Sequence, residues 1–504
     1  MSALATEGEA AAPRATLAVR DAARGSVFRE LPTDDPTAVA EAAARARAAQ
    51  PAWAALSVKE RLGVLAAARR ELVRGRAAVL DALAAETGKP RVDVVGELLG
   101  ICLELRALSK KAARWLSRER VSARPFVGKR GYVLYKPRGL VGVLGPWNAP
   151  LHLTFVDAFP ALVAGNAVIV KPSEVTPVAV YEAVLALNRV LPPGILQVVV
   201  GGPDVGAAVV DHVDLVCVTG SSATGRRVME RAARRLTPVL LELGGNDPMI
   251  VLADADLDRA ARAAAWGGCL MTGQVCMSVE RVYVEEAVAE PFTRKLEAEL
   301  ARLRFGADDG SREVDFGPFI GPRQIEIVER HVADAVERGA RVVLGGKRAA
   351  SATGVYFPPT LLTGVRADMA IMREETFGPV IPVQVVKDAF EAIRHANDCE
   401  HGLSASVGTR DLARGLALAE RIESGSVWVN ECVLVAAVPA LPFGGLKQSG
   451  VGTRHGGAEG LRQFCVRQAV FADRTGLKRE WSWFPYSTRR ARLLDALLHH
   501  VFGR

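Results

Sequence analysis

The stretch GLVGVLG (139–145), followed by AVIVKP (167–172) and LVCVTGS (215–221), decides the fold class of this chain. Each is a short apolar run bounded by glycine or proline, which is typical of a strand buried on both faces of a sheet. Helical patterns such as residues 178–189 separate these runs. Strands that alternate with helices in this way predict a parallel, doubly wound α/β sheet.

The same alternation continues after these runs. Further predicted strands are ILQVVVGG (195–202), VLLELGG (239–245), MIVL (249–252), RVYVE (281–285), RVVLGG (341–346), PVIPVQVV (379–386) and SVWVN (426–430). The strands after Gly245 form a set of their own, with helices such as 325–338 between them. The sequence therefore predicts two doubly wound α/β domains.

A helical region precedes the first set of strands. From Asp35 to Glu119 the chain is rich in Ala, Leu, Arg and Glu, and apolar residues recur three and four positions apart. This spacing predicts amphipathic helices, which we expect to be separated at Pro51, at 88–90 and at Gly96.

Two further segments differ from both sets. Residues 121–137 alternate loosely with Val, Phe and Tyr, which predicts a β-hairpin with a turn near Gly128. Residues 474–504 contain the aromatic run 481–486 and a segment whose leucines would form one apolar helical stripe beside arginines. This tail could dock on a subunit surface and gate the site, or lie in a membrane interface. We favour docking, because about 14 helical residues are too few to span a bilayer.

Composition places the chain among ordinary globular proteins. Its 504 residues are 49% hydrophobic and 24% charged, which excludes disordered, collagen-like and small disulfide-rich proteins. Lys and Arg number 64 against 56 Asp and Glu, and this net charge of +8 is too modest to predict a nucleic-acid partner. The seven cysteines are scattered without zinc-ligand spacing, so we expect a reducing compartment and no metal. Residues 1–14 lack the apolar run of a secretory signal, which predicts a disordered tail and a cytoplasmic protein.

Seven motifs in a fixed order carry the residues suited to chemistry. They are PWNAP (146–150), KPSE (171–174), VTGSSATG (218–225), LELGG (241–245), GQVC (273–276), EETFGP (374–379) and PFGG (442–445). This ordered set closely resembles the NAD(P)-dependent aldehyde dehydrogenase superfamily, from about residue 35 to residue 473. The segments GSSATG, SVERVYVE and SGVGTRHG look like those of bacterial succinate-semialdehyde dehydrogenases.

Three residues are the predicted catalytic groups. A thiolate attacks an aldehyde carbon reversibly, and Cys276 stands among the small residues of a loop, although a buried packing cysteine is the alternative. By resemblance, Asn148 and the Cys276 N–H form the oxyanion hole; the alternative is that Asn148 caps the next helix. Glu242 ends an apolar strand, where its pKa would rise, and by resemblance it is the general base of thioester hydrolysis rather than an ion-paired structural residue.

The resemblance also implies the cofactor site, because no GxGxxG fingerprint follows the first sheet strand. The matching residues are Trp147, Lys171, Ser173, Glu174, Gly220, Ser221, Gly225, Leu243, Gly244, Glu375 and Phe377. Glu174 would repel a 2′-phosphate, which favours NAD while leaving NADP open. Retention of Glu242 implies that the product is the free acid and not an acyl-CoA.

The predicted substrate wall is mostly apolar. By motif position it includes Leu153, Val156, Val275, Met277 and Phe443, and the loop 431–441 would close it. We find no Arg at these positions to pair with a substrate carboxylate, which would be costly to bury alone. The sequence therefore favours a medium aliphatic or aromatic aldehyde, with succinate semialdehyde as the alternative.

The resemblance further implies a domain plan and a homodimer or homotetramer. The expected parts are an NAD-binding domain (15–120 and 138–243), a small β oligomerisation arm (121–137 and 464–473), a catalytic domain (244–463) and the tail (474–504). The arm would add its strands across subunits and so cover its sheet edges. A catalytically silent binding or structural protein with the same fold is the hypothesis from another class; retention of Cys276, Glu242 and Asn148 argues against it.

Overall fold

The computed structural model describes residues 15–308, 310, 313–351, 353–434 and 438–503. The predicted disordered tail (1–14) and the centre of the predicted closing loop (435–437) lie outside the described residues. The chain forms two compact units. The larger comprises the chain up to Leu116 together with Lys136–Val466, and the smaller comprises Ser117–Tyr135 together with the chain from Arg467 onward.

A six-stranded sheet forms the first part of the larger unit, in the order β20-β9-β8-β5-β6-β7. Its strands are β5 (Leu140–Leu144), β6 (Ala167–Lys171), β7 (Leu196–Val198), β8 (Leu215–Thr219), β9 (Val239–Glu242) and β20 (Gly450–Val451). The strands β5 to β9 run parallel, as the alternation with helices predicted, and β20 adds antiparallel to β9.

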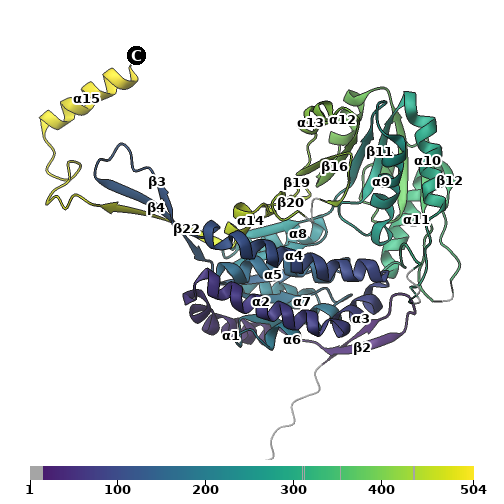
Figure 1. Cartoon of the computed structure of the whole chain (residues 1–504), viewed down its shortest axis with the longest axis horizontal. Coiled ribbons are helices and arrows are strands. Elements are labelled where there is room, and N and C mark those ends of the chain that lie inside the picture. Colours follow the sequence, from purple (N-terminus) through teal and green to yellow (C-terminus); the bar gives the residue numbers. More distant parts are fainter. Residues whose placement is uncertain (1–14, 309, 311–312, 352, 435–437, 504) are drawn as a thin grey trace, which may run out of the picture. The chain divides into compact units, whose positions relative to one another are not determined.

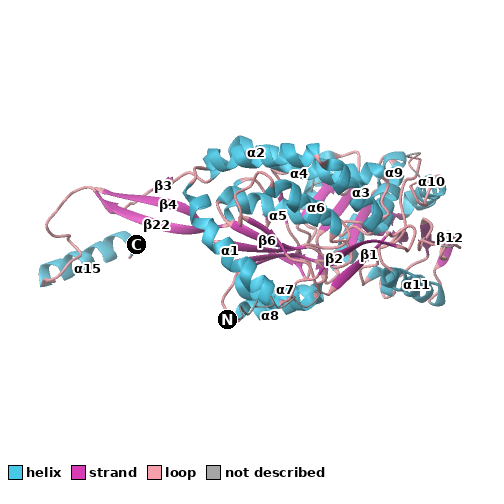
Figure 2. Cartoon of the chain, turned by 90° about the horizontal axis from the view of Figure 1, so that it is seen from below, coloured by secondary structure: helices cyan, strands magenta, loops and turns pink. Residues whose placement is uncertain are grey.

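Helices pack against this sheet. They are α1 (Pro36–Ala55), α5 (Pro150–Ala164), α6 (Val178–Asn188), α7 (Pro203–His212) and α8 (Ser222–Ala233). In Figure 2, α5 and α6 lie on one side of β6 while α7 and α8 lie on the other. A further layer, α2 (Val58–Arg74), α3 (Arg76–Thr87) and α4 (Arg91–Trp115), packs on α5 and α6. The sheet is therefore doubly wound.

Two of the predicted helix breaks are wrong. Pro51 lies inside α1 and Gly96 lies inside α4. Trp53, two residues after Pro51, is buried, and this packing stabilises the last turn of α1 although proline removes one helical hydrogen bond. The break instead falls at Ser57, which starts α2 with a capping box: Ser57 N–H donates to the Glu60 carboxylate at 2.7 Å.

A seven-stranded sheet forms the second part of the larger unit, in the order β12-β13-β14-β11-β10-β16-β17 (Figure 1). Its strands are β10 (Asp247–Val251), β11 (Val279–Glu285), β12 (Arg341–Leu344), β13 (Thr360–Thr363), β14 (Val380–Val386), β16 (Ser404–Gly408) and β17 (Ser426–Val429). The sequence analysis did not find β13 and β16, whose short runs include Thr and Ser. The strand β12 pairs antiparallel with β13, and the others are parallel to their neighbours.

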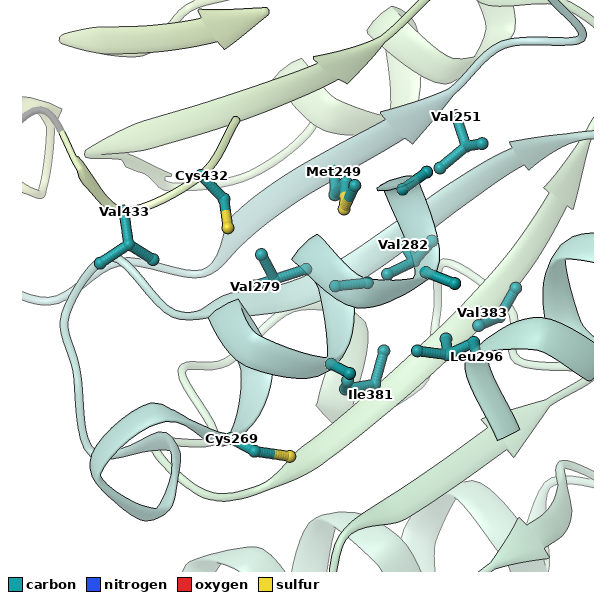
Figure 3. Packing of buried hydrophobic residues seen from close by; sticks show 14 of the residues in the cluster. Met249, Val251, Cys269, Val279, Val282, Leu296, Ile381, Val383, Cys432 and Val433 are labelled. Carbon is teal, nitrogen blue, oxygen red and sulfur yellow. The ribbon is translucent and has the colours of Figure 1, made fainter. Parts of the chain in front are cut away.

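Alternation along these strands builds two cores. Met249 and Val282 belong to a cluster with residues of α9 (Leu257–Cys269) and α10 (Ala289–Ala301), part of which is shown in Figure 3. Their neighbours Ile250 and Tyr283 belong to a second cluster with residues of α11 (Pro322–Glu337) and α12 (Ala389–Asn397). Because successive side chains of a strand point to opposite faces, both faces of this sheet are buried.

The smaller unit contains a three-stranded sheet and a helix. The sheet order is β22-β4-β3, with β3 (Glu119–Val121), β4 (Lys129–Pro137) and β22 (Cys465–Asp473). The strands β3 and β4 are antiparallel, and Gly128 lies between them at φ 79°, where a residue without Cβ is favoured. The helix α15 (Thr488–Phe502) follows in the tail.

Shorter elements of the described chain include the hairpin of β1 (Thr16–Arg20) and β2 (Val27–Pro32) and the helices α13 (Leu412–Ala419) and α14 (Ala458–Arg462). Two further antiparallel pairs are β15 (His401–Gly402) with β19 (Leu446–Lys447) and β18 (Pro442–Phe443) with β21 (Arg454–His455). Among the described residues, no helix is both long and apolar enough to cross a bilayer. The predicted domain boundaries stay a prediction.

Candidate active site

The carboxyl ends of four parallel strands bring the predicted site residues together. Trp147 and Asn148 follow β5, Lys171 ends β6, Gly220 follows β8, and Glu242 ends β9. Since these strands are neighbours in the order β9-β8-β5-β6, their ends share one edge of the sheet. Ligands of open α/β sheets bind at this edge.

A cavity of about 700 Å³ opens at this edge. Its lining includes ten of the eleven predicted cofactor residues, namely Trp147, Lys171, Ser173, Glu174, Gly220, Ser221, Leu243, Gly244, Glu375 and Phe377, together with Asn148 and Cys276. Gly225 is the exception. A Cβ there would lie 2.8 Å from the Leu243 methyl carbons, so Gly225 allows α8 to pack against Leu243.

One end of the cavity is suited to a dinucleotide phosphate and ribose. Ser221 caps α8, and its hydroxyl accepts a hydrogen bond from Thr224 N–H at 3.2 Å, so the positive end of the helix faces the cavity. Lys171 Nζ lies 3.0 Å from Glu174 Oε2. Burial raises the pKa of Glu174, but the Lys171 charge, the hydrogen bond from Lys171 and a backbone hydrogen bond together lower it by more, so this carboxyl is ionised.

The sequence analysis missed three arginines that line the same cavity. Arg227 and Arg231 are on α8, Arg234 is its C-cap residue, and Arg231 Nε donates to Asp211 at 2.8 Å. They recur at spacings of four and three residues after the predicted phosphate segment, which places them on one face of the helix. That spacing was the signal available in the sequence.

The opposite end of the cavity is formed by Glu375 and Phe377. Glu375 Oε1 accepts a hydrogen bond from Gly245 N–H at 3.0 Å, and burial raises the pKa of this carboxyl to about 7. The rings of Phe377 and Trp147 meet edge to face, with their centroids 5.4 Å apart. These residues fit a ribose and a flat heteroaromatic ring, so the chain has groups for both ends of a nicotinamide dinucleotide.

Glu280 holds this end of the cavity, and the sequence analysis did not single it out. Its two carboxyl oxygens accept hydrogen bonds from Thr376 N–H and Phe377 N–H, both at 2.7 Å. Phe377 has φ 54°, which is uncommon for a bulky residue. The buried Glu280 therefore stabilises the turn that presents Phe377.

Cys276 ends a loop whose backbone is tightly constrained. Met271 and Thr272 both have positive φ, at 51° and 65°, and the Thr272 hydroxyl donates to the Gly317 carbonyl at 2.9 Å. Cys276 is partly exposed and lines the cavity. Burial raises its pKa, and the carboxyls of Glu375, Asp247 and Glu242 add to this effect, so the group is a thiol that needs a base.

Asn148 contacts the same loop. Its Nδ2 donates to the Gln274 carbonyl at 2.9 Å, two residues before Cys276. The N-cap of α5 is Ala149, and no side chain caps this helix, so Asn148 does not have the capping role that was the alternative interpretation. An amide nitrogen carries two hydrogens, and the Gln274 carbonyl takes one of them.

Glu242 lies at the buried end of β9. It is 5% exposed, its Oε2 has no hydrogen-bond partner among the described residues, and burial raises the pKa of its carboxyl to about 8. It does not line the cavity itself, although Leu243 next to it does. The Oε2 atom is therefore a buried acceptor without a hydrogen-bond partner, one residue from the cavity lining, and its raised pKa suits the predicted base.

A buried ion pair stands beside Glu242. Arg454 donates to Asp157 through Nε at 2.8 Å and through Nη2 at 2.6 Å. The same Nη2 donates to Thr219 Oγ1 at 2.8 Å, and Thr219 is the register partner of Glu242 in the next strand. Sequence analysis quoted Arg454 only within a motif, because the pairing of residues 297 positions apart cannot be read from a local pattern.

The predicted substrate residues lie in two places. Val275, Met277 and Phe443 belong to the core cluster around α9 and α10, and Leu153 is partly buried on α5. Val156 lines a small cavity of about 20 Å³ together with Glu104, Arg454 and His455. The wall without arginine stays a prediction, although Arg454 lines the same small cavity as Val156.

Comparison with known proteins agrees with this arrangement. The family model described as the aldehyde dehydrogenase family matches residues 9–470. This chain belongs to the aldehyde dehydrogenase family. An aldehyde dehydrogenase relative from Methylomonas sp, named 4,4′-diapolycopene aldehyde oxidase, is 38% identical over 493 residues, covering 97% of this chain and 92% of its own. A Mycobacterium tuberculosis protein whose name refers to succinate-semialdehyde dehydrogenase with NADP(+) is 39% identical, covering 91% of this chain and 89% of its own.

Solved aldehyde dehydrogenase structures superpose closely. The NAD-dependent aldehyde dehydrogenase from Sinorhizobium meliloti gives a TM-score of 0.88 at 32% identity, covering 93% of each chain. Betaine aldehyde dehydrogenase from Staphylococcus aureus, solved in complex with NAD⁺, gives 0.88 at 28% identity, covering 94% of each chain. Membership makes this chain an oxidoreductase for aldehydes, in a family whose members use NAD or NADP.

Proposed function

We propose that this chain oxidises an apolar aldehyde to the free carboxylic acid, with Cys276 as the nucleophile. The observation that carries this proposal is that one cavity is lined by Cys276, Asn148, Glu375 and Phe377. A thiol, an amide donor and the residues suited to a dinucleotide therefore line the same cavity. These are the groups that thiol-dependent aldehyde oxidation needs.

In the proposed first half-reaction, the Cys276 thiol gives its proton to solvent water in the cavity, and Sγ bonds to the aldehyde carbon. The carbonyl oxygen becomes an oxyanion, which the free Nδ2 hydrogen of Asn148 and the Cys276 N–H stabilise. A bound nicotinamide cofactor would supply the acceptor for the hydride of this carbon, and the carbonyl re-forms as the hydride leaves. A thioester of Cys276 remains.

In the proposed second half-reaction, Glu242 removes a proton from a water molecule. The water oxygen bonds to the thioester carbon, the carbon–sulfur bond breaks, and the acid leaves with Cys276 restored. The raised pKa of Glu242, to about 8, makes its carboxylate a stronger base than an ordinary one. Hydrolysis by Glu242 supports a free acid rather than an acyl-CoA product.

For the cofactor we propose NAD, with NADP as a weaker alternative. The ionised Glu174 opposes a 2′-phosphate, while Arg227 and Arg234 in the same cavity would attract one. The names of the relatives include both cofactors. The mycobacterial protein is named with NADP(+), and the S. meliloti structure is named NAD-dependent.

For the substrate we propose a medium aliphatic or aromatic aldehyde. The Methylomonas relative is named for a hydrocarbon aldehyde, in agreement with the apolar side chains of Val156 and Leu153. Succinate semialdehyde is the second candidate, because the mycobacterial relative is named for it and Arg454 lies beside Val156. Arg454 already donates to the carboxylate of Asp157, which makes it less suited to bind a substrate carboxylate. A homodimer or homotetramer is proposed on the family resemblance.

The test is reduction of NAD or NADP, followed at 340 nm, with hexanal, benzaldehyde and succinate semialdehyde. We expect Cys276→Ser to reduce turnover by at least about 10³-fold. Cys269→Ser is the matched control, because Cys269 is seven residues away, buried in the core cluster and absent from the cavity lining. Equal loss in both variants, or no turnover in protein shown to bind NAD, would contradict the proposal and favour a silent binding protein.

A further inference from the structure

Positive charge is concentrated at the end of the chain. Residues 474–504 hold seven Lys or Arg and two acidic residues, a net charge of +5 out of +8 for all 504 residues. The family model ends at residue 470, so these residues lie beyond the part shared across the family. The match to the Methylomonas relative spans 493 of the 504 residues, which is too many to leave this tail out.

The helix α15 has one apolar face whose side chains are exposed. At 100° per residue, six large apolar side chains fall on one half of the helix, and each is at least 46% exposed. These are Leu493, Leu494, Leu497, Leu498, Val501 and Phe502. Arg489, Arg492, Asp495, His499 and His500 fall on the other half, whereas Arg490, in the first turn, falls among the apolar positions. This is the pattern of a helix that lies in the plane of a membrane interface.

Aromatic residues precede the helix and are held to its first turn. The Arg490 guanidinium lies 5.4 Å from the Trp481 ring centroid and 5.7 Å from that of Tyr486. Arg490 Nη1 also donates to the Trp483 carbonyl at 2.9 Å. The rings remain exposed, with Trp481 at 54% and Trp483 at 55%. Tryptophan and tyrosine favour the headgroup level of a bilayer, where an apolar ring and a polar edge are both accommodated.

We propose that residues 474–504 bind the surface of a bilayer that contains anionic lipids, with α15 lying in the interface, instead of docking on a subunit surface as the sequence alone favoured. The charge of the tail complements such a surface, whereas a second copy of this chain carries the same net positive charge. The binding itself does not depend on the proposed function. Its consequence does: an enzyme held at a membrane meets apolar aldehydes that partition into lipid.

The experiment is co-sedimentation of the full chain with vesicles of phosphatidylcholine alone or with 30% phosphatidylglycerol. We expect at least about tenfold more bound protein on the anionic vesicles at 50 mM NaCl, and loss of most of it at 500 mM NaCl. Deletion of 475–504 is expected to abolish binding. Leu494→Glu with Leu497→Glu, and separately Arg489→Glu with Arg492→Glu, are each expected to reduce it at least about tenfold.

The matched control is Leu412→Glu with Leu416→Glu on α13. These leucines are 60% and 55% exposed and also lie four residues apart on a helix, but they are outside the tail. We expect this variant to bind anionic vesicles as the unchanged chain does. Equal loss in both leucine pairs would overturn the proposal.

Two other results would also overturn it. One is no binding to anionic vesicles at 50 mM NaCl. The other is a tail that packs on a second copy, seen as a change in oligomer mass on deletion of 475–504 without vesicle binding. Turnover of water-soluble hexanal, measured for every variant, keeps the two proposals apart: vesicle binding without any turnover would contradict the proposed function alone.

Discussion

Arg454 binds Asp157 through two hydrogen bonds in the interior of the chain, where their side chains are 5% and 2% exposed. The Nη1 of Arg454 has no hydrogen-bond partner in the described chain, and neither does Oε2 of the neighbouring Glu242. Burial raises the pKa of Glu242, the Arg454 charge lowers it and the Asp157 charge raises it. The two charges of the ion pair therefore shift the pKa of the proposed base in opposite directions.

The first prediction concerns how loss of either charge changes the pH dependence of hydrolysis. In Asp157→Asn the negative charge is lost, so the pKa of Glu242 should fall and the pH profile of thioester hydrolysis should move to lower pH. In Arg454→Met the positive charge is lost, so the profile should move to higher pH. The measurement is the single-turnover rate of hydrolysis between pH 6 and pH 10.

Removing one partner of a buried pair also destabilises the fold, by about 3–5 kcal/mol. Arg454→Lys, which keeps the positive charge, is the control for this loss of stability. Chemical unfolding measures the free energy of unfolding of each variant. If both variants lose stability but their profiles move in the same direction, the electrostatic explanation is wrong.

A second prediction concerns Glu242 itself. In Glu242→Gln the acylation of Cys276 should continue while hydrolysis slows by about 10²–10⁴-fold, so a burst of NADH should precede a slow steady state. In the unchanged chain, hydrolysis should rise with pH up to about 8, because the base must be ionised. A linear time course without a burst, at the unchanged rate, would exclude Glu242 as the base.

The same carboxyl has a predicted effect on stability. Its pKa is raised to about 8 in the folded chain from 4.5, so the unfolded chain releases the proton first as pH rises. Its contribution to the free energy of unfolding should therefore fall by about 1.4 kcal/mol per pH unit between pH 5 and pH 8. Chemical unfolding of Glu242→Gln should lack this slope, and the difference between the two proteins isolates this group from other buried carboxyls.

A third prediction concerns the oxyanion site. Asn148→Ala removes the hydrogen bond to the Gln274 carbonyl and the free Nδ2 hydrogen, and kcat should fall by about 10²–10³-fold. Asn148→Asp is the informative comparison, since it keeps the size of the side chain but places an acceptor next to a carbonyl and a developing oxyanion. It should be at least as inactive as the alanine variant. Near-normal kcat in either variant would assign the oxyanion contact elsewhere.

The sequence predicted the strands that carry the site because their signal is local. Runs such as 139–145 and 167–172 are apolar, short and bounded by turn residues, so their ends could be located and the residues after them placed at one edge. The expected breaks at Pro51 and Gly96 failed for the opposite reason. Tertiary packing around residues such as Trp53 outweighed the intrinsic preference of a single residue.

The missed part of the site consists of contacts between distant positions. Glu280 binds Thr376 N–H, 96 residues away, and Arg454 binds Asp157, 297 residues away. No spacing rule within one element predicts such pairs. No local pattern distinguishes Glu280 from other acidic residues near a strand, because its role depends on Thr376 and Phe377 lying next to it in the folded chain.

A fourth prediction tests Glu280. In Glu280→Gln only one oxygen remains to accept the hydrogen bonds from Thr376 N–H and Phe377 N–H, so the turn at Phe377 should loosen. We expect KM for NAD to rise by about tenfold, equivalent to the loss of one hydrogen bond to a charged or strongly polar group, with a smaller change in KM for the aldehyde. Isothermal titration calorimetry with NAD measures binding directly. An unchanged KM for NAD would show that Phe377 holds its conformation without Glu280.

The last prediction concerns the choice between NAD and NADP. Glu174 is ionised and paired with Lys171, while Arg227 lines the same cavity. In Glu174→Ser the repulsion of a 2′-phosphate is removed and Lys171 is released, so the ratio of kcat/KM for NADP to that for NAD should rise by about tenfold or more. Arg227→Ala should lower the same ratio, and the double variant should show whether the two effects add. Arg323→Ala on α11 is a control, because Arg323 is not among the residues that line this cavity. If Glu174→Ser leaves the ratio unchanged, charge at this position does not select the cofactor, and the preference must come from the arginine face of α8.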